Sequence, residues 1–200
     1  MNFEIVLATN NSHKLQEVRK ILSPHKITVY GLNDLNLKPE EAEENTDNYF
    51  GNALIKAESV QKLTTMPIIA DDSGLEIEAM DNKPGIKSAR YAQENGGHEK
   101  AIQTILDFLK DKNNRKARFV CDIVLLNVED KPLLFEGISE GHIATSPSGN
   151  GGFGYDPIFI PKGEKESFAD LGEDIKNKLS HRGKALNKLL TYLKIKGLAR

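Results

Sequence analysis

The sequence predicts an α/β protein in which a mixed β-sheet is flanked by helices. Strand-like and helix-like patterns alternate along its 200 residues, with no internal repeat or low-complexity linker. Residues 3–8 form a short apolar run typical of a buried strand, and a polar turn and a helical pattern follow it. This length suits one large domain, or one domain in two lobes, and can bury a core without disulfide bonds. We expect a single domain over residues 1–200.

Helices are expected where apolar residues recur every three or four positions. Four such stretches follow the first strand, and the last has Ser180 as a possible N-cap and Gly197 as its stop. The residues that define these helical faces are Leu15, Val18 and Leu22; Ala53, Ala57 and Val60; Ile102, Ile105, Leu106 and Leu109; and Leu186, Leu189, Leu190 and Leu193.

Further strands are expected between these helices. Apolar residues 66–70 predict a strand that leads into a turn at residues 71–74, after which residues 75–79 alternate as a second strand. Two long apolar stretches, 117–128 and 133–143, surround a polar segment and predict an antiparallel hairpin. Together with the first strand, these segments make the predicted sheet mixed.

Composition excludes several classes of protein. The formal net charge of -2 gives no global reason to expect a nucleic-acid or membrane partner. Cys121 is the single cysteine and lies in an apolar run, which favours a buried reduced thiol. No signal-peptide pattern and no apolar run of about eighteen residues occurs. We expect a soluble, cytoplasmic protein.

The segment Asp71-Asp72-Ser73-Gly74 is the strongest chemical signal. A strand that ends in acidic residues delivers carboxylates to the rim of a sheet, where open α/β proteins place their ligands. Two adjacent carboxylates repel each other unless a cation, hydrogen bonds or a shifted pKa offsets the repulsion. Strand side chains alternate, so we expect Asp72 to enter a cleft while Asp71 orients it. The same four residues also suit an ordinary turn.

Two other segments could hold phosphate or metal. Between the first strand and the first helix, a lysine follows small polar residues at a helix N-terminus, where an anion can bind. An ordinary helix cap followed by a solvated lysine explains them equally well. The acidic residues 40–44 are a solvated face or include a carboxylate that could join Asp72 at Mg²⁺. The residues of the possible phosphate loop are Thr9, Asn10, Asn11, Ser12, His13 and Lys14.

Two later segments complete the set of candidates. Residues 149–154 formally match a dinucleotide-binding glycine pattern, but a turn and a strand follow instead of a helix, so we reject that interpretation. The loop, with Phe153 and Tyr155, suits either a flat ligand that stacks on a ring or a mobile hairpin. Near the start of the last helix, Lys176, His181 and Arg182 suit contacts to phosphate or a base edge, or a capped and solvated helix start.

Taken together and in order, these motifs resemble those of the inosine triphosphate pyrophosphatase (ITPase) family, the Ham1/RdgB-like enzymes. The resemblance covers nearly the whole chain. The matching motifs are Thr9-x-Asn11-x-x-Lys14, Asn52-Ala53-x-x-Lys56-Ala57, Ala70-Asp71-Asp72-Ser73-Gly74, Pro84-Gly85-Ile86-x-Ser88-Ala89-Arg90-Tyr91, Gly151-Gly152-Phe153-Gly154-Tyr155-Asp156-Pro157 and Ser180-His181-Arg182-Gly183.

The resemblance implies an ITPase-like fold, with an elongated mixed sheet and two lobes around a nucleotide cleft. It implies Mg²⁺-dependent hydrolysis of ITP, dITP and XTP to the monophosphate and pyrophosphate by a homodimer. By position, Asp72 resembles the catalytic base and a metal ligand, and Glu44 the other metal ligand. The substrate contacts it implies are Thr9 to Lys14, Ser73, Phe153, Gly154, Tyr155, Asp156, Lys176, His181 and Arg182. Gly51 departs from the family, which often has Glu there.

Other functions fit parts of the pattern. A purine-nucleotide-binding regulator could use the same loops without hydrolysis, and a Maf-like nucleotide pyrophosphatase would share the chemistry but prefer other bases. A nucleic-acid-binding module would need a basic stripe, whereas residues 112–118 supply only a short basic patch. A P-loop enzyme is excluded because its phosphate-binding motif does not occur.

Overall fold

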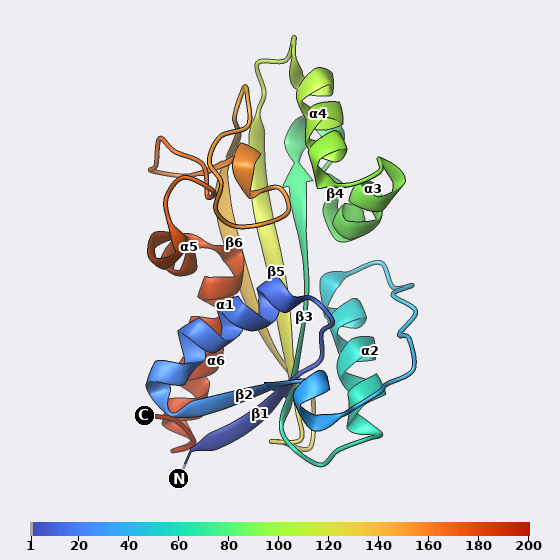
Figure 1. The fold of residues 1–200 in the computed structure, drawn as a ribbon, viewed down its shortest axis with the longest axis vertical. Coiled ribbons are helices and arrows are strands. Elements are labelled where there is room, and N and C mark those ends of the chain that lie inside the picture. Colours follow the sequence, from blue (N-terminus) through green and yellow to red (C-terminus); the bar gives the residue numbers. More distant parts are fainter. Residues whose placement is uncertain (1) are drawn as a thin grey trace. The chain divides into compact units, whose positions relative to one another are not determined.

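The structure, a computed structural model, describes residues 2–200. Its elements alternate as the sequence predicts (Figure 1). The strands are β1 (Phe3–Leu7), β2 (Ile27–Gly31), β3 (Ile68–Ile77), β4 (Lys83–Pro84), β5 (Lys116–Leu126), β6 (Leu133–Ile143) and β7 (Phe159–Pro161). The helices are α1 (Ser12–Leu22), α2 (Tyr49–Gln61), α3 (Ser88–Glu94), α4 (His98–Leu109), α5 (Glu173–Leu179) and α6 (His181–Ile195).

The sheet is mixed, as predicted. Its strand order is β2-β1-β3-β5-β6-β7, and β4 pairs with β3. Strand β1 runs parallel to both β2 and β3, whereas β3 with β4 and β6 with β7 are antiparallel pairs. At the base of the predicted hairpin, the Ile143 N–H donates to the Arg115 carbonyl at 2.9 Å. The prediction of an α/β fold with a mixed sheet and flanking helices is confirmed.

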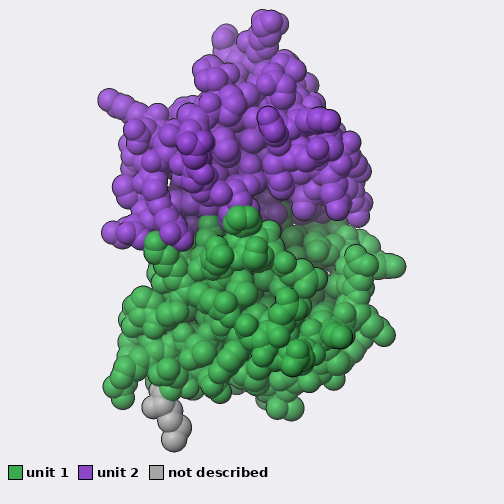
Figure 2. All heavy atoms as spheres, viewed as in Figure 1, with its two compact units in different colours: residues 1–72, 121–137, 183–200 green, residues 73–120, 138–182 purple. Residues whose placement is uncertain are grey.

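The chain divides into two compact units, which are coloured separately in Figure 2. Unit 1 contains the chain up to Asp72, Cys121–Gly137 and Gly183–Arg200. Unit 2 contains Ser73–Val120 and Ile138–Arg182. Strands β3, β5 and β6 contribute residues to both units. That residues 1–200 form one domain stays a prediction.

Unit 1 buries both faces of its part of the sheet. Since strand side chains alternate, Ile5 and Leu7 of β1 pack into one cluster with α1 and α6, and Val6 packs into another with α2. In β5, Ile123 joins the first cluster and Val124 the second. The alternation determines which helix each polar side chain of β3 and β5 can meet.

Unit 2 packs α3 and α4 on its own part of the sheet. Leu75 and Ile77 of β3 join the apolar face of α4 in one buried cluster. Phe119, Phe159 and Phe168 meet in the same cluster, and the ring centroids of Phe119 and Phe159 lie 4.7 Å apart. This aromatic centre holds together β5, β7 and the segment after β7 that contains Phe168.

The predicted turn at residues 71–74 is wrong. Strand β3 runs without interruption from Ile68 to Ile77, through both aspartates and Gly74. Turn chemistry favours Asp because its side chain can cap nearby backbone groups, and Gly because it adopts a positive φ without strain. Here Asp71 and Asp72 are paired with lysine side chains instead, which leaves the backbone free to continue the strand.

Two side chains of unit 1 cover the outer edge of β2, which stands at one end of the strand order. Arg19 Nε donates to the Val29 carbonyl at 3.0 Å, and the Gly31 N–H donates to Asp34 Oδ2 at 2.6 Å. Arg19 also pairs with Asp34. Free N–H and C=O groups on an edge strand can pair with another chain. The Arg19–Asp34 pair therefore protects the edge of β2.

We expect Arg19→Ala to promote self-association, because it frees the Val29 carbonyl and releases Asp34. The free energy of unfolding should fall by about 1 kcal/mol for the lost hydrogen bonds. Light scattering over several days and urea denaturation measure the two effects. Lys62→Ala is the control, since Lys62 is exposed and loses the same charge. Identical behaviour of the two variants would contradict the protective role of Arg19.

Candidate functional site

The strongest candidates lie near the middle of β3, where Asp71 and Asp72 are both buried, with 4% and 6% of their surfaces exposed. Because strand side chains alternate, Asp71 lies on the face shared with α1 and Asp72 on the face shared with α2. Each carboxylate meets a lysine from the helix on its own face. The adjacent charges are thus neutralised separately.

Asp71 is paired with Lys14. Lys14 Nζ lies 3.0 Å from Asp71 Oδ2, and the lysine side chain is only 16% exposed. Asn11 caps α1, since its side-chain oxygen accepts from the backbone N–H groups of His13 and Lys14. The capped helix start is therefore confirmed, whereas a fully solvated Lys14 is not.

The rest of the predicted phosphate loop lies around this helix start. Thr9 Oγ1 accepts from the Asn11 N–H at 3.1 Å, while Asn10, Ser12 and His13 are exposed. The first turn of α1 contains no acidic residue, and Lys14 lies in it. A helix N-terminus with a cation and no carboxylate of its own is suited to bind an anion.

Asp72 is held by α2. Asn52 Nδ2 donates to Asp72 Oδ2 at 3.1 Å, and Lys56 Nζ lies 3.3 Å from Asp72 Oδ1. Asn52 is fixed in turn, because its Oδ1 accepts from the Thr46 hydroxyl at 2.8 Å. Burial raises the pKa of Asp72, although Lys56 opposes this shift and Glu44 adds to it. The carboxylate is therefore more basic than that of an exposed aspartate.

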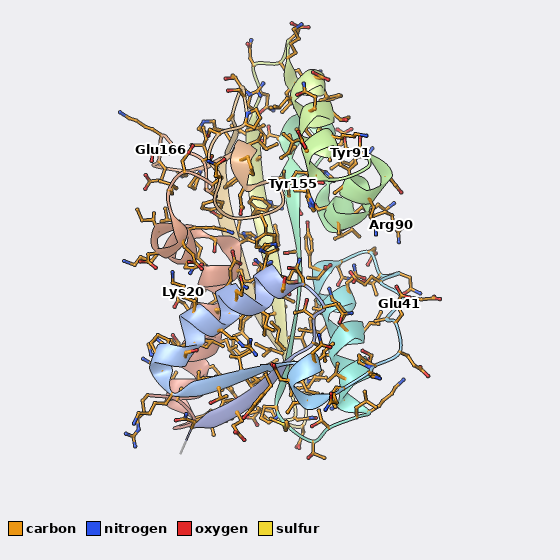
Figure 3. All side chains as sticks on the ribbon, viewed as in Figure 1. Lys20, Glu41, Arg90, Tyr91, Tyr155 and Glu166 are labelled. Carbon is orange, nitrogen blue, oxygen red and sulfur yellow. The ribbon has the colours of Figure 1, made fainter. Side chains whose placement is uncertain are left out.

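Lys56 joins the two proposed metal ligands. Its Nζ lies 3.4 Å from Glu44 Oε1 and 3.3 Å from Asp72 Oδ1. Burial alone would lower the pKa of Lys56, but Asp72, Asp71 and Glu44 outweigh burial and raise it. Glu44 is half exposed, and Glu41 of the same acidic stretch is exposed on the loop before α2 (Figure 3). Glu44 is thus the acid of this stretch for which a link to the Asp72 site is seen.

The two carboxylates fit a hard cation that keeps much of its water. Among residues 2–200, no cluster of three or more Asp, Glu, His or Cys side chains could hold a metal. Mg²⁺ needs less than that, because it commonly takes one or two carboxylates and completes its octahedron with waters and substrate phosphates. Carboxylate oxygens of Glu44 and Asp72, both close to one ammonium nitrogen, meet this requirement.

The sequence did not point to Asp122 as a site residue. It is an acidic residue in the otherwise apolar inner part of β5 and is 7% exposed. Burial raises its pKa to about 6, and the nearby carboxylates of Glu136 and Asp72 add to the shift. The only available signal was the single charge between Cys121 and Ile123.

In unit 2, a buried ion pair holds the glycine-rich loop. Lys176 Nζ lies 2.7 Å from Asp156 Oδ2, and the same oxygen accepts from the Phe153 N–H at 2.8 Å. Lys176 Nζ also lies 4.6 Å from the centroid of the Phe153 ring. Lys176 belongs to α5, a separate helix, and not to the start of the last helix as expected. The ammonium group of Lys176 therefore helps to fix the Phe153 ring.

The other predicted residues of unit 2 have different surroundings. Tyr155, labelled in Figure 3, is buried and donates from its hydroxyl to the Ser88 carbonyl at 2.8 Å. His181 is stacked on Phe119, with ring centroids 4.5 Å apart. Arg182 donates to Ser73 Oγ at 3.1 Å and lies 5.7 Å from the Phe153 ring centroid. Phe153 is the aromatic ring best able to receive a planar ligand.

Gly154 supplies the backbone shape that this loop needs. Its φ is +65°, a conformation that other residues rarely adopt, and an added Cβ would lie 3.7 Å from His98 Nε2. The glycine therefore lets the chain turn between the partly buried Phe153 and the buried Tyr155.

The fold and these sites define an α/β protein whose buried carboxylates and lysines suit a substrate that carries phosphate. The pattern of the Ham1 family matches residues 5–192. The chain belongs to the Ham1 family.

Relatives of the chain support this membership. It is 44% identical over 191 residues to a dITP/XTP pyrophosphatase of Porphyromonas gingivalis, a match that covers 95% of this chain and 97% of the relative. It is 42% identical over 192 residues to the dITP/XTP pyrophosphatase of Bacillus subtilis, with 95% and 96% covered. The solved structure of the Staphylococcus aureus Ham1 protein is similar, with a TM-score of 0.84 and 37% identity over 96% of this chain and 99% of that one.

We expect Asp122→Asn to stabilise the protein at neutral pH. The folded-state pKa of about 6 lies above the ordinary value of 3.8, so ionisation of Asp122 costs folding free energy above pH 6. The free energy of unfolding of the variant should exceed that of the wild type by on the order of 1–3 kcal/mol at pH 7.5. This difference should shrink as the pH falls through 6 toward 4. Urea denaturation at three pH values measures it. A gain that is equal at all three would contradict the raised pKa.

Proposed function

We propose that this protein is a Mg²⁺-dependent nucleoside triphosphate pyrophosphatase. It hydrolyses non-canonical purine nucleoside triphosphates (ITP, dITP and XTP) to the monophosphate and pyrophosphate, and thereby removes them from the nucleotide pool. Membership of the Ham1 family supports the activity, and Asp72, buried and held by Lys56, is the observation that supports the chemistry.

The residues of unit 1 suit the triphosphate. Lys14 and Lys56 supply positive charge near a helix N-terminus and beside Asp72, and the loop from Thr9 to Lys14 offers polar groups for phosphate oxygens. In-line attack of water on the α-phosphorus releases pyrophosphate. Asp72 orients that water and accepts its proton, which contributes about 10²- to 10⁴-fold. Asn52 and Lys56 hold the Asp72 carboxylate in place for this step.

In this proposal Glu44 and Asp72 hold Mg²⁺, which when bound neutralises phosphate charge and stabilises the leaving pyrophosphate. Lys56 keeps the two carboxylates together when the metal is absent, because its ammonium nitrogen lies within 3.4 Å of both. The protein thus holds its metal ligands in place before substrate arrives.

The residues around Phe153 suit the purine. We assign stacking of the base to Phe153, whose ring is held by Lys176 and Arg182. Arg182 and Ser73 supply hydrogen-bonding groups, and Tyr155, Asp156 and Gly154 fix the loop that carries Phe153. His181, stacked on Phe119, is assigned as a further nucleotide contact. Donors that meet a 6-oxo group remain unpaired when adenine binds, which disfavours ATP.

The decisive test is a pyrophosphate assay with Mg²⁺ and, separately, dITP, XTP, ATP and GTP. The wild type should release pyrophosphate from dITP and XTP in preference to ATP. Asp72→Asn should lower kcat by about 10²-fold or more, because the amide cannot accept the proton. Unchanged melting temperature of the variant controls for folding. Release of orthophosphate, or wild-type turnover by Asp72→Asn, would contradict the proposal.

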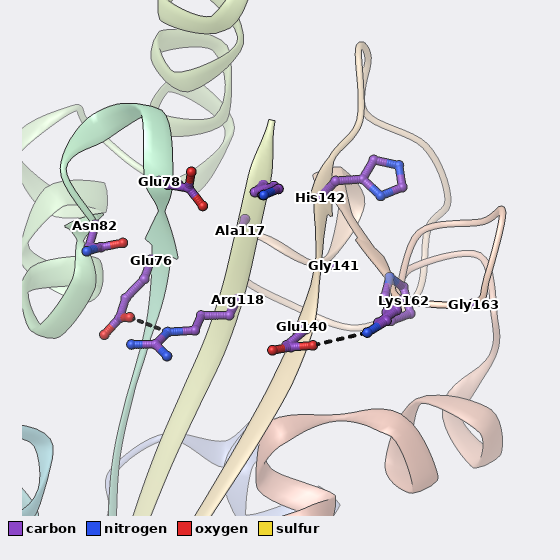
Figure 4. A pocket seen from close by; sticks show the side chains of 12 residues that line it. Glu76, Glu78, Asn82, Ala117, Arg118, Glu140, Gly141, His142, Lys162 and Gly163 are labelled. Atoms are coloured by element: carbon purple, nitrogen blue, oxygen red, sulfur yellow. Dashed lines mark hydrogen bonds and ion pairs between the residues drawn. The ribbon is translucent and has the colours of Figure 1, made fainter. Parts of the chain in front are cut away.

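A homodimer and a cytoplasmic location belong to the same proposal. The buried thiol of Cys121, which forms no disulfide, supports a reducing compartment. Among residues 2–200, no helix has both the length and the apolar character to cross a bilayer. The support for a dimer comes from a hollow of about 820 Å³ in unit 2, which none of the predicted site residues lines (Figure 4).

Charges alternate in a row across the strands of this hollow. Glu76 of β3, Arg118 of β5, Glu140 of β6 and Lys162 after β7 follow one another, and Figure 4 shows the ion pairs Glu76–Arg118 and Glu140–Lys162. A two-fold axis that runs parallel to the strands, between β5 and β6, would place a second copy on this surface with its row in the opposite order. Glu76 of one copy would then face Lys162 of the other, and Arg118 would face Glu140. Each carboxylate would then face a cation, which favours pairing of like surfaces.

We expect Arg118→Glu to dissociate the dimer, because two like-charge contacts replace two opposite-charge ones. Adding Glu140→Arg should restore it, since the row then again complements its own reverse. Light scattering coupled to gel filtration measures the mass, and Lys165→Glu in an exposed loop of unit 2 is the matched control. A monomeric wild type, or a double variant as dissociated as Arg118→Glu, would contradict this interface.

A further inference from the structure

We propose that Asp122 is a positioning residue for Asp72: it fixes the first turn of α2, the helix whose side chains hold the Asp72 carboxylate. This inference rests on the proposed function, in which Asp72 acts as the base. It concerns residues of unit 1 alone.

The position of Asp122 in β5 directs its side chain toward α2. Val124 and Leu126 have the same parity in the strand, and both pack in the buried cluster that contains Ala53 and Ala57 of α2. Asp122 lies at the end of this row of apolar residues. Its strand is the neighbour of β3, which carries Asp72.

The contact that matters is at the start of α2. The backbone N–H of Phe50, in the first turn of the helix, donates a hydrogen bond to the Asp122 carboxylate. The first turn contains no acidic residue of its own. A carboxylate near a helix N-terminus satisfies a free N–H and complements the helix dipole. Here the neighbouring strand supplies it.

The surroundings of Gly51 disfavour a carboxylate at that position of the helix. A Cβ at Gly51 would lie 2.6 Å from Thr46 Oγ1. That hydroxyl is already engaged, because its oxygen lies 2.8 Å from Asn52 Oδ1 and 2.9 Å from the Asn48 carbonyl oxygen, to either of which it can donate. A side chain at position 51 would therefore displace the residue that orients Asn52, and an acid on β5 avoids that conflict.

The first turn of α2 leads directly to the residues that hold Asp72. Asn52 follows Phe50 by two positions and donates to Asp72 Oδ2, and Lys56 follows one turn later and pairs with Asp72 Oδ1. Asn52 is 2% exposed and has little room to adjust. A shift in the first turn is therefore transmitted to the Asp72 carboxylate.

Stability alone does not explain an acid at this position. Asp122 Oδ1 is buried and has no hydrogen-bond partner among the described residues. Burial and the nearby carboxylates of Glu136 and Asp72 raise its pKa, so its ionised form is costly in the folded state. An apolar residue beside Val124 would avoid this cost. The contact with Phe50 is what such a residue could not make.

The test compares Asp122→Val with Asp122→Asn in the full-length protein, with dITP and Mg²⁺. Valine has the volume for the site but accepts no hydrogen bond, whereas the asparagine oxygen can still accept from the Phe50 N–H. We expect Asp122→Val to keep or raise the melting temperature while kcat falls about 10-fold or more and KM changes less than about twofold. Asp122→Asn should keep kcat within about threefold of wild type, because the acceptor remains.

Two further measurements separate positioning from packing. Hydrogen exchange of the Phe50 amide should accelerate in Asp122→Val and stay protected in Asp122→Asn. Val124→Ala removes packing under the same helix and should lower the melting temperature while kcat stays within about twofold of wild type.

The outcomes are distinct. Asp122→Val with wild-type kcat, or Asp122→Asn as slow as Asp122→Val, would overturn the proposal. A loss of kcat in Asp122→Val that only follows a lowered melting temperature would also overturn it. If the wild type releases no pyrophosphate, the proposed function fails instead, and exchange of the Phe50 amide then decides by itself whether Asp122 fixes the start of α2.

Discussion

The need to neutralise two consecutive buried carboxylates organises unit 1. Asp71 and Asp72 lie on opposite faces of β3, so a single cation cannot serve both. Lys14 reaches Asp71 from α1, and Lys56 reaches Asp72 from α2. A buried carboxylate without a partner is strongly destabilising, so both helices must pack where their lysines meet β3. The positions of α1 and α2 on the two faces follow from this constraint.

The two lysines differ in what surrounds them. Lys14 lies in the first turn of α1, where the helix dipole disfavours a cation and where bound phosphate would offset that cost. Lys56 lies in the second turn of α2, among Asp72, Asp71 and Glu44, whose charges raise its pKa. Lys14 therefore gains from an added anion, whereas Lys56 already has more negative charge around it than it neutralises. That excess of negative charge is what suits the Asp72 side to a metal ion.

Periodicity was enough to predict the elements that bury an apolar face. The faces of α1, α2, α4 and α6 follow from residues such as Val18, Ala57 and Ile105, and the long strands β5 and β6 follow from their apolar runs. The sequence did not predict β2, α3 or α5, because these elements are short and depend on tertiary neighbours. The prediction of a turn at residues 71–74 was wrong for the same reason. A continuous strand is stable there because Lys14 and Lys56, which are distant in the sequence, pair with the two aspartates.

Chemistry that depends on distant partners was also beyond the sequence. The motifs predicted Asp72 as a site residue and the helix that carries Lys56. The link from Glu44 to Asp72 through Lys56 was seen only in the structure. Tyr155 matches its motif and yet donates from its hydroxyl to the Ser88 carbonyl within the core. A motif identifies residues that occur together, whereas burial and partners decide which of them can still meet a ligand.

Asp72 and Ser73 are consecutive residues with different assigned roles. Asp72 is the last residue of its segment in unit 1, and Ser73 is the first of the next segment in unit 2. Asp72 is assigned to the reaction and Ser73 to substrate contact, and both lie in β3. Because consecutive Cα atoms are only about 3.8 Å apart, a shift of one residue moves the other. Arg182, which donates to Ser73, likewise ends its own segment. Substitutions at Ser73 and Arg182 should therefore affect kcat and KM together, whereas those at Phe153 should act mainly on discrimination between bases.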